Sequence, residues 1–209
     1  MGMKTRIGVV ADTHCPEFTD RLPRTLLEAF SGVDLILHAG DVTGPGTLAQ
    51  LARIAPVEAA RGDHDRELPD LPLIRHVVVE GRRIVVLHGN RSRWVEEPQT
   101  LLWTLSLGHY HPHRRLPPVL RRRFPDADVI VFGHTHRSLV DASGGPLVVN
   151  PGGVHQWNRA TTAARLAQHP AWFEWSWLQV ARHIRSYQSP SCAILDVGPG
   201  GVEARIVAL

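Results

Sequence analysis

Aspartate and histidine recur along the chain at or just after apolar stretches. They occur in five segments: Asp12-Thr13-His14, Gly40-Asp41, Gly62-Asp63-His64-Asp65, His88-Gly89 and Gly133-His134-Thr135-His136. Carboxylate oxygen and imidazole nitrogen bind divalent transition metals, and α/β sheets present their chemistry at the ends of strands. Together the segments predict a metal centre built from several loops, and therefore a hydrolase.

None of these segments is diagnostic alone. An Asp-x-His sequence is more often a turn than a pair of ligands, and Gly-Asp and His-Gly are common loop sequences. The segment from Gly133 to His136 is more specific, because two imidazoles one residue apart in a glycine-led turn can both point into one pocket. The order of the segments along the chain is the stronger signal.

The elements that must position these residues follow from hydrophobic patterning. In the first part of the chain, buried strands are expected over residues 6–11, 33–38 and 57–60, with helices over 23–30 and 47–54. Strand–helix repeats favour a parallel sheet with right-handed crossovers. In the second part, hairpins are expected over 74–87, 138–149 and 192–208, and a buried strand over 129–132. Two sheets, each covered by helices, satisfy both parts.

Two further segments are predicted to be helical inserts in a single domain spanning residues 1–209. The first, near 94–123, crowds together His109, His111, His113, Arg114, Arg115, Arg121, Arg122 and Arg123. This cluster is either a basic rim that receives a phosphate-rich substrate or a solvated helix face, and charge runs are usually the latter.

The second insert, near 155–188, is rich in tryptophan. At helical spacing Trp172 and Trp175 share one face, and another face carries Phe173, Trp177, Val180 and Ile184. One apolar face can cover the domain's own sheet, whereas a second needs a partner, most simply another copy of the chain. The alternatives are a homodimer or higher homo-oligomer and one broad buried face.

Composition excludes several classes of protein. With 43% hydrophobic and 21% charged residues the chain is an ordinary globular sequence, and it has no apolar run long enough to cross a membrane. Its net charge of +3 is too small to indicate nucleic-acid binding. Two widely spaced cysteines, and a start that runs directly into a strand without a signal peptide, predict a cytoplasmic location.

The ordered segments, with Asn150-Pro151-Gly152, resemble the calcineurin-like metallophosphoesterase superfamily. Within it they resemble the small bacterial and archaeal phosphodiesterases related to the retromer scaffold subunit. The resemblance covers roughly residues 3–153 and the closing hairpin from Cys192. It implies an α/β fold, a four-layer αββα sandwich of two mixed β-sheets, and a dinuclear metal centre whose bridging hydroxide is the nucleophile.

Position by position, the resemblance also implies a ligand set. Asp12, His14 and His136 would hold one divalent ion, Asp63, His88 and His134 the second, and Asp41 both. His64 would contact the scissile phosphate or protonate the leaving oxygen, and Asp65 would orient it. The chemistry agrees, because a bridging ligand must be a carboxylate and an imidazole suits proton donation near neutral pH. Manganese is expected first, and iron, zinc, nickel or cobalt also suit these ligands.

Asp63 departs from the family pattern, which usually has asparagine there. Asp63, Asp12 and Asp41 together bring three negative charges, and a bridging hydroxide would add a fourth. These four charges would completely neutralise two divalent ions. Metal binding should tighten and attraction for an anionic phosphodiester should weaken. Three outcomes are open: a more highly charged second ion, a protonated Asp63 or a slower enzyme. We expect Asp63 still to bind metal.

The sequence thus favours a metal-dependent phosphodiesterase acting on a phosphoester substrate. One alternative is a non-catalytic, protein-binding scaffold like the retromer subunit, but that relative lacks the catalytic histidine, and this chain has His64 beside Asp65. Another is a phosphomonoesterase or a nuclease. Nucleic acid would need an open basic groove with stacking aromatics, and the sequence offers only the arginine cluster, so this partner is not favoured.

Overall fold

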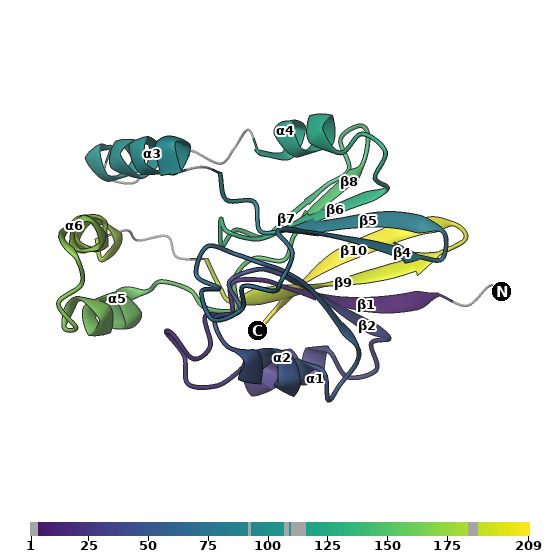
Figure 1. The fold of residues 1–209 in the computed structure, drawn as a ribbon, viewed down its shortest axis with the longest axis horizontal. Coiled ribbons are helices and arrows are strands. Elements are labelled where there is room, and N and C mark those ends of the chain that lie inside the picture. Colours follow the sequence, from purple (N-terminus) through teal and green to yellow (C-terminus); the bar gives the residue numbers. More distant parts are fainter. Residues whose placement is uncertain (1–3, 92, 107–108, 110–115, 184–187) are drawn as a thin grey trace.

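Two five-stranded sheets lie face to face at the centre of the molecule (Figure 1). The computed structural model describes residues 4–91, 93–106, 109, 116–183 and 188–209. The first sheet has the strand order β10-β9-β1-β2-β3 and the second has the order β4-β5-β6-β8-β7. Both sheets are mixed, as the sequence predicted.

In the first sheet, three parallel strands come from the predicted strand–helix repeats. They are β1 (Thr5–Val10), β2 (Leu35–Ala39) and β3 (Val57–Ala60). The hairpin of β9 (Ser191–Gly198) and β10 (Gly201–Ala208) completes the sheet, with β9 antiparallel to β1. Hydrophobic alternation predicts a hairpin from local sequence, but the sheet that it joins depends on distant contacts.

In the second sheet, β5 (Arg82–Leu87), β6 (Val129–Phe132) and β8 (Leu147–Asn150) are parallel. The edge strands β4 (Ile74–Val79) and β7 (Leu139–Asp141) pair antiparallel with β5 and β8. The predicted hairpins are therefore present, and a central parallel segment lies between them.

The core is divided into three apolar layers. Between the sheets, Ile7 and Val9 pack in the same cluster as Val86 and Val131. A second cluster holds the first sheet against α1 (Arg24–Ala29) and α2 (Pro45–Leu51). A third holds the second sheet against α4 (Leu116–Arg123). Alternation within β1 explains the layering, because Ile7 and Val9 face the other sheet while Val10 faces the helices.

The remaining helices lie together beyond one end of the sandwich (Figure 1). The first predicted insert forms α3 (Arg93–Leu105) and α4, and the second forms α5 (Arg159–Leu166) and α6 (Trp172–Ala181). Of these four insert helices, only α4 covers a sheet, whereas α3, α5 and α6 project from the end at which β1, β2, β5 and β6 terminate. None of the helices in the described part of the chain is long and apolar enough to span a membrane.

Candidate metal centre

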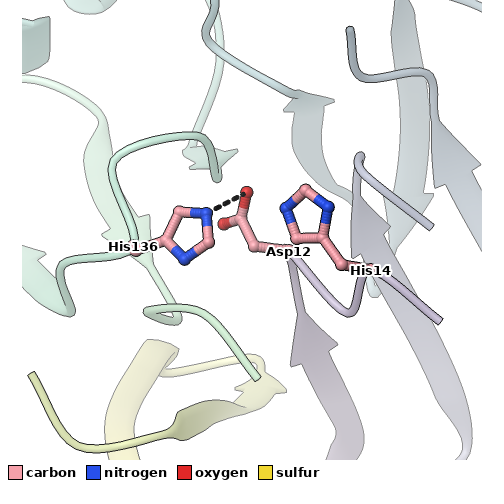
Figure 2. A group of neighbouring side chains, drawn as sticks. All are labelled: Asp12, His14 and His136. Carbon is pink, nitrogen blue, oxygen red and sulfur yellow. Dashed lines mark ion pairs between the residues drawn. The ribbon is translucent and has the colours of Figure 1, made fainter. Parts of the chain in front are cut away.

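Carboxylates and imidazoles from five separate loops converge where the parallel strands end. Among the described residues, four groups each have ligand atoms that all lie within 4.8 Å of one another: Asp12–His14–His136, Asp63–His88–His134, Asp12–Asp41–His88 and His14–Glu17–His64. Figure 2 shows the first group, with the Asp12 carboxylate between the rings of His136 and His14. The structure thus brings together all the residues that the family pattern suggested as ligands.

Asp41 lies between the first two groups. Its Oδ2 atom is 3.4 Å from His14 Nε2 and 3.2 Å from His88 Nε2. Those two imidazoles belong to different groups, so one carboxylate oxygen reaches both. A shared carboxylate of this kind is what a two-metal site requires.

Backbone carbonyls fix the tautomers of two ligand histidines. His88 Nδ1 donates to the carbonyl oxygen of Ala39 at 2.8 Å, and His136 Nδ1 donates to that of His155 at 2.8 Å. A carbonyl only accepts, so each Nδ1 carries a proton and each Nε2 is the atom available to a metal ion. His88 Nε2 faces Asp63 Oδ1 at 3.0 Å and His136 Nε2 faces Asp12 Oδ1 at 3.5 Å. This arrangement is typical of metal-binding imidazoles.

The charges at the centre favour a cation. Burial alone would lower the pKa of His88, but the Asp41 and Asp63 carboxylates outweigh burial and raise that pKa well above its usual value. Without an ion, a proton therefore supplies the positive charge beside these carboxylates. In addition, Asp12 Oδ2 is buried and accepts no hydrogen bond from the described residues. A divalent cation would satisfy that oxygen and replace the proton, so the donor set fits the implied metals.

The backbone is strained at most of these residues. Positive φ angles occur at Asp12 (52°), His14 (43°), Asp41 (55°), His134 (66°) and His136 (53°). Non-glycine residues rarely adopt this region, and each such residue costs about 1–3 kcal/mol. Hydrogen bonds between neighbouring loops hold the conformation, including Asp12 N to Gly40 O and His14 N to Asp41 O, both 3.0 Å. Strain concentrated at ligand positions is typical of a functional site.

Two glycines in the metal-ligand segments, Gly62 and Gly133, lie so close to neighbouring loops that a side chain would not fit. A Cβ atom on Gly62 would collide with the carboxylate of Asp41. A Cβ atom on Gly133 would lie 2.7 Å from both Ala11 Cβ and Ala39 O. These glycines let the loops that carry Asp63 and His134 approach the first sheet.

Asp65 organises the ligand loops. It is buried, and its carboxylate accepts backbone N–H bonds from Gly62 (2.7 Å), Thr43 (2.7 Å) and Asp41 (3.0 Å). None of these three bonds reaches the ring of His64, which Asp65 was expected to orient. Asp65 therefore orients His64 only indirectly, through the backbone of their shared loop.

Glu17, which the sequence analysis missed, is the carboxylate that holds His64. Its oxygens lie 2.9 and 3.0 Å from His64 Nδ1, and one of them is 3.2 Å from His14 Nδ1. Burial acts to raise the pKa of Glu17, but hydrogen bonds from both imidazoles outweigh it and lower that pKa to about 2. Burial acts to lower the pKa of His64. The hydrogen bond to Glu17 and the charges of the nearby carboxylates outweigh burial and raise that pKa to about 9. An acid three residues after a ligand histidine was the available sequence signal.

Glu96 on α3 is a second unpredicted acid at the site. Its Oε2 atom is 3.7 Å from His134 Nε2, while His134 Nδ1 faces Asp63 Oδ1 at 3.6 Å. Arg91 Nε donates to Glu96 Oε1 at 2.9 Å. Burial acts to raise the pKa of Glu96, but the bonds to His134 and Arg91 lower it to about 2. The first insert thus contributes a carboxylate directly behind a ligand histidine.

Two adjoining cavities open at the centre. One, of about 630 Å³, is lined by His14, Asp41, His64, His136 and Arg66, among others. The other, of about 920 Å³, lies against α3 and α6. Asp63, His64, His134 and Trp177 line both cavities.

The predicted basic cluster does not form a rim around either cavity in the described residues. Arg121 donates to Asp141 and to the carbonyl of Pro146, so it fastens the β7–β8 hairpin. Arg122 and Arg123 line neither cavity, and His109 is exposed away from both. The remaining members, His111, His113, Arg114 and Arg115, lie outside the described residues.

Comparison with known proteins places the chain in a family. Residues 5–169 match the calcineurin-like phosphoesterase superfamily domain. A "Probable metallophosphoesterase" of Methanothermobacter thermautotrophicus is 33% identical over 147 residues, which cover 70% of this chain and 75% of that protein. The chain belongs to the calcineurin-like phosphoesterase superfamily. This confirms the resemblance drawn from the ordered segments.

Solved structures share the fold at lower identity. Vps29 from Chaetomium thermophilum matches with a TM-score of 0.62 and 21% identity, covering 98% of this chain and 96% of that one. An archaeal protein described as a novel phosphodiesterase matches with a TM-score of 0.56 and 18% identity, covering 98% and 99%. These matches confirm the predicted four-layer sandwich. At such identities they establish the fold alone.

Proposed function

We propose that this protein is a metal-dependent phosphodiesterase with a dinuclear centre. The observation that carries the proposal is the position of Asp41 Oδ2, 3.4 Å from His14 Nε2 and 3.2 Å from His88 Nε2. Asp12, His14 and His136 would hold one ion, and Asp63, His88 and His134 the other. Bound there, two divalent ions, manganese in the first instance, would activate a water molecule and neutralise charge on the phosphate.

His64 is the proposed proton donor. Its ring lines both cavities, and Glu17 occupies its Nδ1 side, which leaves Nε2 as the atom available to a substrate. The proton on Nε2 would pass to the leaving oxygen as the P–O bond breaks. Proton transfer of this kind contributes about 10²- to 10⁴-fold to rate.

Two features favour a diester over a monoester. A diester has two organic substituents, and the structure has two adjoining cavities that share Asp63, His64 and His134 among their lining residues. A monoester carries one more negative charge, which would meet the carboxylates of Asp12, Asp41 and Asp63. Repulsion grows with each unit of charge, particularly in a partly buried site.

A non-catalytic scaffold remains the second candidate because Vps29 has the same fold. His64 favours the enzyme, because a scaffold gains nothing from an imidazole that lines both cavities and is held by the Glu17 carboxylate. The two functions differ in what His64→Ala changes. In an enzyme, the His64→Ala substitution abolishes turnover. A scaffold has no turnover, so the substitution changes none.

The test is a metal-reconstituted assay. The protein is stripped with a strong chelator, reloaded separately with manganese, iron, zinc, nickel and cobalt, and measured for metal content per chain. Each form is assayed against matched diesters and monoesters, with His64→Ala as the catalytic control and His76→Ala, on strand β4, as the control for loss of a histidine. We expect about two ions per chain and turnover that depends on both metal and His64. Full activity in chelator, or in His64→Ala, would refute the mechanism.

A further inference from the structure

We propose that the larger cavity is a subsite for a neutral, planar aromatic substituent of the phosphodiester, of about the size of a nucleobase. This inference rests on the proposed function and adds the chemical class of the substrate. The volume of the larger cavity, about 920 Å³, is at the upper end of the range for small-molecule sites in proteins.

Aromatic side chains from three elements line this cavity. Trp103 comes from α3, Phe132 from the end of β6, and Phe173 and Trp177 from α6. Aromatic faces on several sides favour a flat ring, because stacking does not depend on a particular hydrogen-bond pattern. Such a wall offers little to a flexible polar chain.

The cavity is continuous with the metal centre. Asp63, His64 and His134 line it, and the same residues line the cavity that contains His14, Asp41 and His136. A phosphate bound at the proposed ions would therefore lie beside the larger cavity. One of its ester substituents would extend between α3 and α6.

Charge on the wall restricts the substituent. Besides Asp63, which belongs to the proposed metal centre, Glu96, Glu97 and Asp141 contribute carboxylates to the wall, against Arg91 and Arg137. Arg91 is already bonded to Glu96 at 2.9 Å. Arg121 likewise pairs with Asp141 at 3.1 Å, so the charges on this wall nearly cancel. The wall therefore offers no surplus of positive charge to a second phosphate, and a neutral group fits better than a polyphosphate.

The sequence of α6 provides matched controls. Phe173 and Trp177 are four residues apart on one helix face and line the cavity. Trp172 and Trp175 line neither cavity, and are 78% and 46% exposed. The helix therefore separates cavity aromatics from solvent-facing aromatics, and substitutions can be compared within the same ten residues.

The test uses two phosphomonoesters that differ only in the base. Adenosine 5′-monophosphate and ribose 5-phosphate are titrated into the manganese-loaded protein, with tryptophan fluorescence and inhibition of diester turnover as readouts. We expect the nucleotide to bind about tenfold or more tightly. Trp103→Ala and Trp177→Ala should each lower this preference about fivefold or more, and Trp103→Phe should retain most of it. Trp172→Ala and Trp175→Ala should leave it unchanged.

The outcomes separate this inference from the proposed function. Equal affinity for the two ligands, or a preference that survives both Trp103→Ala and Trp177→Ala in folded protein, would overturn the subsite. A base preference that depends on Trp103, in protein that turns over no diester, would support the subsite and refute the proposed function. Turnover of diesters with no base preference would support the proposed function and refute the subsite.

Discussion

Glu17→Gln removes the negative charge that faces the Nδ1 atoms of His64 and His14. The distances of 2.9 and 3.2 Å are those of charge-assisted hydrogen bonds, which contribute about 1.5–3 kcal/mol. The side chains of Glu17 and His64 are 34% and 39% exposed, so water screens part of this interaction. We take about 1.4–2 kcal/mol as the effect on the transition state, which is a loss of about 10- to 30-fold in kcat.

The leaving group decides whether that loss is seen. An alkoxide needs a proton from His64 as the P–O bond breaks, whereas 4-nitrophenolate leaves readily without one. We therefore expect the full loss in kcat for a diester with an alkyl leaving group, and less than about threefold for its nitrophenyl counterpart. Both kcat values are measured with the same metal-loaded preparation.

Two controls make this prediction specific. Glu67→Gln changes an exposed glutamate close to His64 in sequence and should leave both rates unchanged. Metal content is measured for each variant, because Glu17 also contacts the ligand His14. An equal loss for the alkyl and nitrophenyl diesters, with metal content unchanged, would refute the assignment of Glu17 as the residue that positions the proton donor.

Three further predictions concern charge, acid stability and association. Asp63→Asn should weaken binding of the second ion about tenfold and lower KM for an anionic diester, as measured by metal competition and steady-state kinetics; unchanged values would contradict the electrostatic argument. The hydrogen bond from Arg121 lowers the pKa of Asp141, so its stabilisation is present above the unfolded-state pKa and is lost as pH falls through the folded one. Asp141→Asn should therefore destabilise by about 1–2 kcal/mol at pH 7, and by progressively less as pH falls below the unfolded-state pKa of about 4, in chemical denaturation. If the predicted homo-oligomer forms through the exposed Trp172 and Trp175, the double serine variant will be monomeric by sedimentation, and an unchanged mass would exclude that interface.

The strands and the ligand positions could be read from the sequence because their signals are local. Apolar runs such as Ile84 to Leu87 predict buried strands, and a polar residue directly after such a run must lie at a sheet edge. Asp12, Asp41 and His88 all occupy such positions. Periodicity alone does not show how the two sheets pack. That arrangement came from the family resemblance, which rests on the order of the segments.

The residues that sequence reasoning missed depend on distant parts of the chain. Glu17 can be recognised as a site residue only when folding brings His64 beside it, and Glu96 only when α3 lies against His134. The larger cavity likewise requires Trp103 and Trp177, from separate inserts, to line the same space. No periodic pattern encodes these contacts, because their relative positions are set by helix packing beyond the end of the sheets.

The site's strain and charge together explain why ion binding and folding should be linked. Asp12, Asp41 and Asp63 are drawn together on loops in a left-handed or closely packed conformation, and a protonated His88 partly offsets their charge. An ion that binds only the native state would release that proton and stabilise the fold, by about 2.7 kcal/mol at a hundred times its Kd. The same carboxylates that make the ion-free site costly therefore make it selective for cations. The inserts then add Glu96 and an aromatic wall to this shared centre, and it is there that the specificity of this chain should lie.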